Sequence, residues 1–250
     1  MSIPPDPSRD FPHRTFGDRT AVDVIIPAYN EVDSIPLVLQ AIPSDVVREV
    51  VVVDNASTDG TADAARAAGA TVVHEPRAGY GSACLAGLAY LTQRTPTPEI
   101  VVFLDGDFSD HPDELPALIA PLIAGRADLV VGSRVLGRRE RGALLPQARF
   151  GNWLAGRLIS MLYGLRVSDL GPFRAIRWET LRDLEMRDRD FGWTAEMQVK
   201  AARQGVRYLE VPVSYRRRIG VSKITGTMSG TVRAGWKILY TVFRFSRGAR

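Results

Sequence analysis

Five short runs rich in Val and Ile, separated by stretches with helical spacing, constrain the fold more than any other feature of this sequence. The runs are residues 22–27, 48–54, 70–74, 99–105 and 127–133. Nearly continuous apolar runs of this length are typical of strands that are covered on both faces. The alternation therefore predicts an α/β fold with a Rossmann-like, mainly parallel sheet flanked by helices. Ligands of such sheets bind beyond the carboxyl ends of the strands, so we look for function in the residues that follow each run.

The composition is that of a globular domain. Of the 250 residues, 45% are hydrophobic and 24% are charged, which excludes disordered and fibrous proteins. Cys84 is the single cysteine, so an internal disulfide and a Cys-rich zinc site are excluded. The low cysteine content is consistent with a protein of a reducing compartment. Residues 1–20 lack the apolar core of a signal peptide and are predicted to be a disordered lead-in. One domain is expected over residues 21–226, followed by a basic amphipathic helix over 227–250.

The charge is distributed unevenly along the chain. Residues 1–125 carry a net charge of −11 and residues 126–250 a net charge of +15. Carboxylates at strand ends in the acidic half suit a metal ion, whereas an Arg-rich half suits phosphate, nucleic acid or an anionic membrane. An arginine on an exposed helix face can equally be solvated and inert.

Acidic residues stand at the ends of two of the predicted strands. Asp54 ends the second run, and turn chemistry explains its neighbours Asn55, Ser57 and Gly60 but not the carboxylate. Asp105 and Asp107 flank Gly106 in the turn that follows the fourth run. Two carboxylates directed toward one spot repel each other unless a cation lies between them, and Mg²⁺ or Mn²⁺ is the ion that such a pair binds.

Two other patterns do not carry a function. Gly79-Tyr80-Gly81 opens a helix as a dinucleotide fingerprint does, but Cys84 stands where that motif needs Gly or Ala, and the stretch follows the wrong strand. A Rossmann dehydrogenase is therefore not expected. His74 and His111 are not spaced as ligands of one metal ion, and neither is assigned a role.

Ordered motifs in both halves resemble a known family. VIIPAYNE, VVDNASTDGT and FLDGDFSD are similar to the nucleotide-sugar-binding half of family 2 glycosyltransferases, which have the GT-A fold. The second half continues the resemblance with GSR, DLGPFRAIR, FGWTAEMQVKAARQG, VPVSYRRR and GVSKITGT. The pattern is most similar to polyprenyl- and dolichyl-phosphate sugar synthases, and it extends over residues 21–240.

The resemblance implies a donor site in residues 21–133. Its residues would be Pro27, Ala28, Tyr29, Glu31, Asp54, Gly79, Gly81, Asp105 and Gly106. The first four would line the base and ribose pocket, and Asp54 would accept a hydrogen bond from the imide N–H of the base. Gly79 and Gly81 would let the backbone approach the nucleotide. Asp105 and Asp107 would carry the ribose and a metal on the diphosphate, where Asp107 serves catalysis.

The resemblance also implies an acceptor site in residues 134–226. Glu196 matches an acidic position near the reaction centre, where it would take a proton or orient the sugar; the alternative is an ion pair with Lys200 one helical turn away. A phosphate acceptor is already ionised at neutral pH, so it needs cations rather than a strong base. The residues assigned to this acceptor site are Arg134, Asp169, Arg174, Arg216, Arg218, Ser222 and Lys223, with Arg217 as a further candidate.

Two segments mix aromatic residues with Arg or Lys in helical register: residues 146–165 and 227–247. This composition is typical of helices that lie in a membrane interface, although packing against the domain or a dimer partner would produce it too. No stretch of 18 apolar residues is present, so no transmembrane span is expected.

These observations favour a metal-dependent, inverting glycosyltransferase that moves a hexose from a UDP- or GDP-linked sugar to a polyprenyl phosphate. We expect a cytoplasmic protein bound peripherally at the inner face of the cell membrane, without a nucleic-acid partner; a homodimer is left open. A soluble or glycan acceptor is the first alternative. A nucleotidyltransferase is disfavoured because PAYNE is not a basic, Gly-rich phosphate loop, and a non-catalytic binding module would not need Asp105, Asp107 and Glu196 together.

Overall fold

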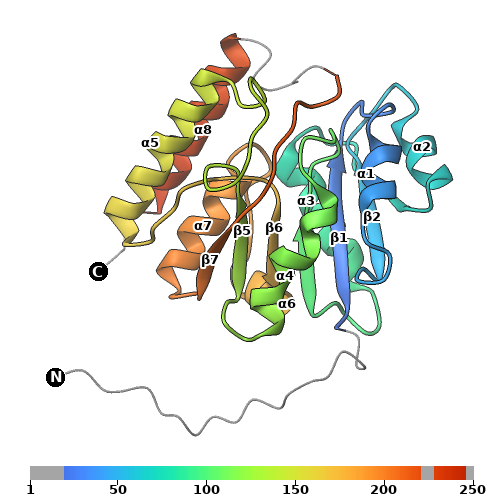
Figure 1. The fold of residues 1–250 in the computed structure, drawn as a ribbon, viewed down its shortest axis with the longest axis horizontal. Coiled ribbons are helices and arrows are strands. Elements are labelled where there is room, and N and C mark those ends of the chain that lie inside the picture. The colour runs from blue at the N-terminus through green and yellow to red at the C-terminus, as the bar shows by residue number, and fades with distance from the viewer. Residues whose placement is uncertain (1–19, 221–227, 246–250) are drawn as a thin grey trace, which may run out of the picture.

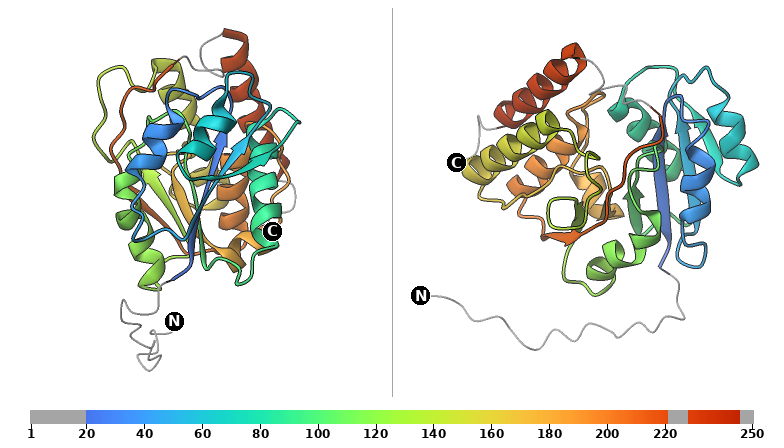
Figure 2. Two further views of the ribbon diagram at one scale, coloured as in Figure 1. Left: turned by 90° about the vertical axis from the view of Figure 1, so that its right-hand side faces the viewer. Right: turned by 45° about the horizontal axis from the view of Figure 1, so that its top comes forward.

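The computed structural model describes residues 20–220 and 228–245, which form one seven-stranded sheet with helices on both faces (Figures 1 and 2). The strands are β1 (Val22–Ala28), β2 (Glu49–Asp54), β3 (Thr71–His74), β4 (Ile100–Phe103), β5 (Leu129–Ser133), β6 (Arg174–Arg177) and β7 (Tyr208–Pro212). The helices are α1 (Ile35–Ala41), α2 (Thr61–Ala67), α3 (Tyr80–Thr92), the 3₁₀ turn η1 (Pro112–Glu114), α4 (Leu115–Ile123), α5 (Pro146–Tyr163), α6 (Trp178–Asp183), α7 (Trp193–Arg203) and α8 (Met228–Arg244).

The sheet has the strand order β3-β2-β1-β4-β6-β5-β7. The five Val/Ile runs are confirmed as β1 to β5, and the α/β class with a mainly parallel sheet is confirmed as well. β1 lies between β2 and β4, and its last residue, Ala28, is opposite Asp54. The carboxyl ends of β1, β2 and β4 therefore meet at one edge of the sheet.

Helices pack on both faces of the sheet, and each face forms an apolar layer. On one face, α1, α2 and α4 contribute residues such as Ile35, Ala65 and Leu118 to a buried cluster with β1 and β4. On the other face, residues of α3, α6 and α7, among them Leu91 and Trp193, pack on the opposite side of the same strands. Both faces of the central strands are therefore buried, which explains their continuous apolar sequence.

The strands β6 and β7 were not predicted from the sequence. β6 runs antiparallel between β4 and β5, while β7 is parallel to β5 at the sheet edge. β6 has only four residues and begins and ends with arginine, so its sequence does not carry the apolar signal of a buried strand.

The two aromatic, basic segments are helices, as predicted. α5 and α8 lie side by side beyond the β7 edge of the sheet, as both figures show, and the Tyr163 hydroxyl donates a hydrogen bond to the carbonyl of Val242 at 2.5 Å. Their inner faces share a small apolar cluster with α7, which includes Ile159, Val199 and Val242. Large side chains on their other faces are exposed, among them Trp153 and Met161 on α5 and Trp236 and Tyr240 on α8.

Candidate active site

The polar residues that follow β1, β2 and β4 gather at the edge of the sheet where these strands end. The loop after β1 is tied to the turn after β2, because the backbone N–H of Asn30 donates to Ser57 Oγ at 3.0 Å and that of Glu31 to Thr61 Oγ1 at 2.8 Å. Tyr29 is exposed. The structure thus places the predicted residue Ala28 opposite Asp54, Pro27 opposite Val53, and ties the loop that carries Tyr29 and Glu31 to the turn that follows Asp54.

Asp54 is buried at the end of β2, and both of its oxygens have partners. Its Oδ1 accepts the backbone N–H of Ser57 at 3.1 Å, and its Oδ2 lies 3.1 Å from Nδ1 of His74. His74 is at the end of the neighbouring strand β3 and is largely exposed. Sequence reasoning missed this residue because parallel pairing with β2, which brings the two side chains together, joins positions 20 residues apart.

Asn55 organises the loop between β3 and α3. Its side-chain amide donates to the carbonyls of Glu75 and Arg77, at 3.0 and 2.7 Å, and its Oδ1 accepts the N–H of Gly79 at 2.8 Å. Turn chemistry had seemed a sufficient explanation for this residue. In the folded chain Asn55 fixes the loop beside Asp54.

Gly79 and Gly81 lie against another segment of the chain. A Cβ atom on Gly79 would lie 2.2 Å from the carbonyl oxygen of Arg189, and one on Gly81 would lie 2.0 Å from that of Asp188. The glycines therefore let the segment before α7 approach the start of α3. This close contact between two parts of the chain accounts for both glycines, and their approach to a nucleotide stays a prediction.

The turn 105–110 after β4 is the most acidic part of the site. Asp107 is buried, and its Oδ1 accepts both the N–H and the hydroxyl of Ser109, at 2.9 and 2.5 Å. Asp105 Oδ1 is buried without a hydrogen-bond partner. Burial and the neighbouring Asp107 raise the pKa of Asp105 to about 7, although Arg218 and Arg134 oppose the shift. Gly106, between them, packs against Ile26 and Ile35.

A divalent cation fits this turn. An unpartnered carboxylate oxygen on Asp105 and a cation already paired with Asp107 Oδ2 both indicate a place for positive charge. Within residues 20–220 and 228–245, no group of three or more His, Cys, Asp or Glu side chains could hold a metal ion. Two carboxylates with substrate phosphates as the remaining ligands are a common way to bind Mg²⁺.

Asp110 was not assigned a role from the sequence. It is 1% exposed, and neither carboxylate oxygen has a hydrogen-bond partner. Burial and the nearby Asp105 raise the pKa of Asp110 well above its ordinary value, although Arg134 opposes the shift. The DGDFSD motif therefore places a third acidic group in the same turn.

A strap formed by residues 213–220 crosses this turn. The backbone N–H of Arg216 donates to the carbonyl of Ser109 at 2.9 Å, and that of Ile219 donates to the carbonyl of Asp107 at 3.0 Å. The guanidinium of Arg216 donates to the carbonyls of Phe108 and Asp110, at 2.7 and 2.9 Å. These contacts use backbone oxygens of the acidic turn and leave its carboxylates to other partners.

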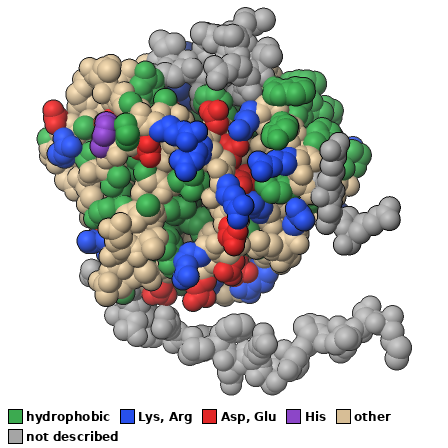
Figure 3. All heavy atoms as spheres, turned by 180° about the vertical axis from the view of Figure 1, so that it is seen from behind, with side chains coloured by type: hydrophobic (Ala, Val, Ile, Leu, Met, Phe, Trp, Pro, Cys, Tyr) green, Lys and Arg blue, Asp and Glu red, His purple; other side chains and the backbone are tan. Residues whose placement is uncertain are grey.

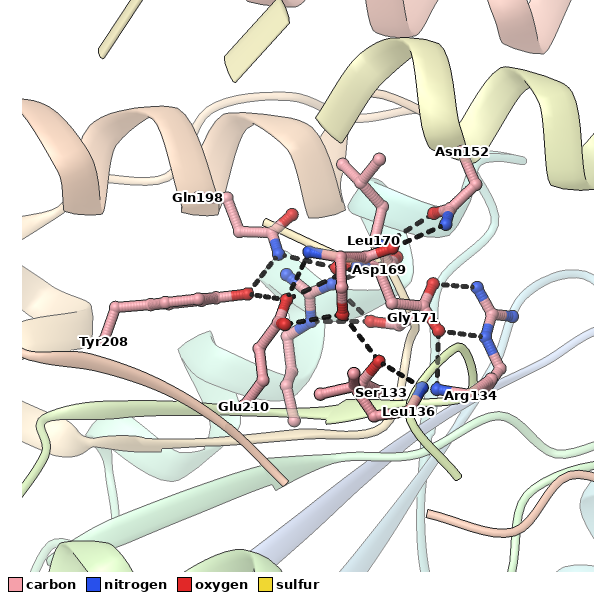
Figure 4. Close-up of polar contacts among 12 residues, drawn as sticks. Ser133, Arg134, Leu136, Asn152, Asp169, Leu170, Gly171, Gln198, Tyr208 and Glu210 are labelled. Atoms are coloured by element: carbon pink, nitrogen blue, oxygen red, sulfur yellow. Dashed lines mark hydrogen bonds and ion pairs between the residues drawn. The ribbon is translucent and has the colours of Figure 1, made fainter. Parts of the chain in front are cut away.

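Arg134 is held rigidly at the end of β5. Its backbone N–H, Nε and Nη2 all donate to the fully buried carboxylate of Asp169, at 2.7, 2.9 and 2.7 Å (Figure 4). Gln198 donates to the backbone carbonyl of Asp169, and Glu210 accepts the N–H and the hydroxyl of Ser168. The structure therefore brings together Arg134 and Asp169, both predicted for the acceptor site, with Asp169 as the residue that orients Arg134.

Arg174 does not reach the site. Its side chain is fully buried, and its guanidinium donates to the backbone carbonyls of Leu170, Gly171 and Thr194. The prediction that it binds an acceptor phosphate is corrected, because it serves to satisfy carbonyl groups in the interior. Ser222 and Lys223, the other predicted phosphate ligands, lie outside the described residues.

Glu196 is also engaged within the protein. Its carboxylate accepts the backbone N–H groups of Arg187 and Asp188, the latter at 2.7 Å, and pairs with Lys200 at 2.8 Å. With 2% of the residue exposed, this is the ion-pair alternative rather than the environment of a free general base. Glu196 fixes the segment that contacts Gly79 and Gly81, which favours a positioning role, and the catalytic role stays a prediction.

A pocket of about 550 Å³ adjoins the Arg134 region at the start of α5. It is lined by Val135, Arg139, Leu144, Pro146, Arg149, Phe150, Asn152, Trp153, Arg157, Val167 and Ser168. Three arginines and several large apolar side chains thus share one cavity. Asn152 and Ser168 connect it to the network around Asp169, since Asn152 donates to the carbonyl of Ser168 at 3.1 Å.

Comparison with known proteins assigns the chain to a family. Residues 23–184 match the model of glycosyl transferase family 2. An uncharacterised glycosyltransferase of Mycobacterium tuberculosis is 42% identical over 88% of this chain and 98% of its own length. The undecaprenyl-phosphate mannosyltransferase of Micrococcus luteus is 34% identical over 82% of this chain and 88% of its own length.

A solved structure has the same fold. The glucosyl-3-phosphoglycerate synthase of Mycobacterium tuberculosis, in complex with Mn²⁺, UDP-glucose and phosphoglyceric acid, superposes with a TM-score of 0.70 at 23% identity, covering 95% of this chain and 85% of that one. The GT-A expectation is thereby confirmed. With a family model that spans most of the chain and relatives that match it over nearly their full lengths, this protein belongs to glycosyl transferase family 2.

Proposed function

We propose that this glycosyltransferase moves a hexose from a nucleoside diphosphate sugar to a polyprenyl phosphate at a membrane surface, with Mg²⁺ or Mn²⁺ on the diphosphate. The observation that carries the proposal is the pocket beside α5, which combines Arg139, Arg149 and Arg157 with Phe150 and Trp153. Arginine pairs with phosphate through several hydrogen bonds, and aromatic rings cover an apolar chain. The relative from Micrococcus luteus is named for a transfer to undecaprenyl phosphate, which supports this acceptor class.

The donor would bind at the edge of the sheet formed by β1, β2 and β4. Asp54 would accept a hydrogen bond from the base, and Asp105 and Asp107 would hold the metal ion. The structural neighbour is described as binding Mn²⁺ together with UDP-glucose, which supports a nucleotide-sugar donor and a divalent metal ion here. When bound, the metal would stabilise the negative charge that develops on the diphosphate as it leaves.

The acceptor side needs cations rather than a base. A phosphate monoester has a second pKa of about 6, so its oxygen is already a nucleophile at neutral pH. In the reaction a phosphate oxygen forms a bond to the anomeric carbon while the bond from that carbon to the diphosphate breaks, with inversion. Arg134, oriented by Asp169, would hold the acceptor phosphate in line, and the engagement of Glu196 elsewhere agrees with a reaction that needs no proton removal.

Membrane association is proposed from the outer faces of α5 and α8. Phe150, Trp153 and Met161 on α5 are 61%, 58% and 73% exposed, and Trp236 and Tyr240 on α8 are 72% and 51% exposed. Exposed aromatic residues beside Arg and Lys are typical of helices at an anionic bilayer surface. In the parts of the chain that the structure describes, no helix is long and apolar enough to cross a bilayer.

The surface opposite the view of Figure 1 is of mixed charge. Figure 3 shows Lys and Arg side chains intermixed with Asp and Glu down the middle of this face, and hydrophobic side chains on the side where α5 and α8 lie. A nucleic-acid-binding face would be more uniformly basic. With the exposed aromatic residues of α5 and α8, we propose peripheral binding at the cytoplasmic face of the cell membrane.

The test is release of nucleoside diphosphate from UDP- and GDP-linked hexoses with Mn²⁺, measured with polyprenyl phosphate in vesicles and with the corresponding unphosphorylated polyprenol. We expect turnover only with the phosphate. Arg149→Gln should raise the KM for the lipid, whereas Arg126→Gln, which removes the same charge from the loop after α4, should not. Turnover that ignores the lipid phosphate and proceeds with a soluble acceptor would refute the proposed acceptor.

A further inference from the structure

Three consecutive arginines on the strap, residues 216–218, have three different sets of partners. Arg216 anchors the strap to backbone carbonyls of the acidic turn, and its guanidinium lies over the ring of Phe108 at 3.5 Å. Arg217 turns the other way and donates to the carbonyl of Arg141. Arg218 pairs with Asp107, with 2.6 Å between Nη2 and Oδ2. Of the three, Arg218 is the one whose guanidinium contacts a predicted metal ligand, Asp107.

The position of the strap does not depend on Arg218. Four hydrogen bonds hold the strap to the turn through main-chain atoms or through Arg216: those from the Arg216 and Ile219 N–H groups and the two from the Arg216 guanidinium. The Arg218 side chain is 31% exposed, so its end can reach solvent or a ligand while the strap remains in place. Its guanidinium is therefore exchangeable, whereas that of Arg216 is structural.

Asp107 cannot keep Arg218 and accept a metal ion at the same oxygen. Its Oδ1 already accepts two hydrogen bonds from Ser109, so Oδ2 is the oxygen that a cation would use. Two like unit charges about 4 Å apart repel by about 4 kcal/mol at the effective dielectric constant of a protein surface, and a divalent ion increases this repulsion. A metal ion on Oδ2 would therefore displace the guanidinium.

We propose that Arg218 holds the cation position on Asp107 in the metal-free protein and, when displaced by the metal, pairs with the diphosphate of the donor. This rests on the proposed donor site and deepens it, because Arg218 moves from the acceptor clamp to the donor. A diphosphate bound through the metal presents oxygens beside Asp107, and guanidinium groups bind phosphate oxygens through paired hydrogen bonds. Metal alone would then compete with Arg218, while metal together with nucleotide would not, so the metal and the donor bind as a unit.

The experiment measures binding in the full chain, without a sugar or an acceptor. Mn²⁺ alone is titrated, and the free ion is followed by electron paramagnetic resonance. We expect Arg218→Gln to bind Mn²⁺ at least about fivefold more tightly than the unaltered protein, because the ion pair that competes with the metal is removed. Arg217→Gln removes the same charge one residue away and should leave the Mn²⁺ affinity within about twofold. Arg218→Lys, which keeps the charge, should be intermediate. Circular dichroism would check that each variant is folded.

A second titration tests the other half of the proposal. With saturating Mn²⁺, the affinity for UDP or GDP, whichever binds the unaltered protein, should fall in Arg218→Gln and stay constant in Arg217→Gln. Equal tightening of Mn²⁺ in both variants, or none in Arg218→Gln, would overturn the competition. Nucleotide affinity unaffected by Arg218→Gln would overturn the transfer to the diphosphate. Failure of the lipid acceptor in turnover assays would touch neither result, since no acceptor is present here.

Discussion

Substitution of Glu196 by Gln separates a positioning role from a catalytic one. In the structure both carboxylate oxygens of Glu196 accept hydrogen bonds from the N–H groups of Arg187 and Asp188, and Lys200 supplies the countercharge. A glutamine side chain has one acceptor and one donor end. Whichever way it is turned, its NH₂ group faces another donor, and Lys200 loses its partner.

The loss of folding stability in Glu196→Gln follows from the burial of the ion pair. The side chains of Glu196 and Lys200 are 3% and 12% exposed, so the pair lies in the interior. Removal of one partner from a buried ion pair costs about 3–5 kcal/mol, because the other charge is left without compensation. For a chain of this size each kcal/mol lowers Tm by about 2–4 °C, which gives a fall on the order of 10 °C. Removal of a general base would instead lower kcat about 10²–10⁴-fold.

The assay therefore pairs thermal unfolding with kinetics well below Tm. We expect Glu196→Gln to lower Tm strongly, to raise the KM of the donor through the displaced segment 187–189, and to keep kcat within about tenfold of the unaltered enzyme. Lys200→Gln is the matched control: it breaks the same ion pair but leaves the N–H acceptors in place, so its loss of stability should be smaller. An unaltered Tm combined with a kcat reduced more than a hundredfold would refute the positioning role.

Three further predictions follow from contacts at the site. Gly81→Ala should destabilise the fold by about 3 kcal/mol or more in urea unfolding, because the added Cβ would lie 2.0 Å from the carbonyl oxygen of Asp188. The control Gly151→Ala lies in open space on α5, so it should stabilise the fold by up to about 1 kcal/mol. Asp54→Ala should weaken nucleotide binding by about 1–3 kcal/mol in calorimetry; lost turnover at unchanged affinity would contradict this role. Because the pKa of Asp105 is about 7 in the metal-free protein, protons should compete with Mn²⁺ below that pH and weaken its binding by up to about tenfold per pH unit, with a plateau above; constant affinity from pH 5.5 to 7 would contradict it.

The first half of the fold could be predicted because local sequence determines it. Strands β1, β2, β4 and β5 are covered on both faces and the edge strand β3 is partly buried, so each produces an apolar run that is visible without knowledge of its neighbours. The acidic turn was visible for a related reason, since Asp105 and Asp107 follow β4 directly and parallel strands end at one edge. The Arg-flanked β6 gave no such signal, because its burial comes from β4 and β5 on either side.

The roles of individual site residues depend on contacts that no local pattern contains. Gly79 and Gly81 resemble a ligand-binding loop, yet the group that approaches them is the carbonyl of a segment about 107 residues further along the chain. Arg134 and Arg174 are the same residue type in the same half of the chain, and only their partners distinguish them. Arg134 is fixed by Asp169 and stays partly accessible, whereas the guanidinium of Arg174 is buried against three backbone carbonyls.

The strap illustrates where sequence reasoning ends. An extended backbone directs adjacent side chains to opposite sides, and on that ground at most one or two of the three arginines could serve the site. The structure agrees with the alternation: Arg216 and Arg218 reach the acidic turn while Arg217 points to Arg141. What the alternation cannot distinguish is Arg216 from Arg218, because both reach the same turn. Arg216 donates to backbone carbonyl oxygens, for which no ligand competes. Arg218 pairs with the carboxylate of Asp107, to which a metal ion would bind. The difference between a structural cation and an exchangeable one therefore lies in the oxygen that each contacts.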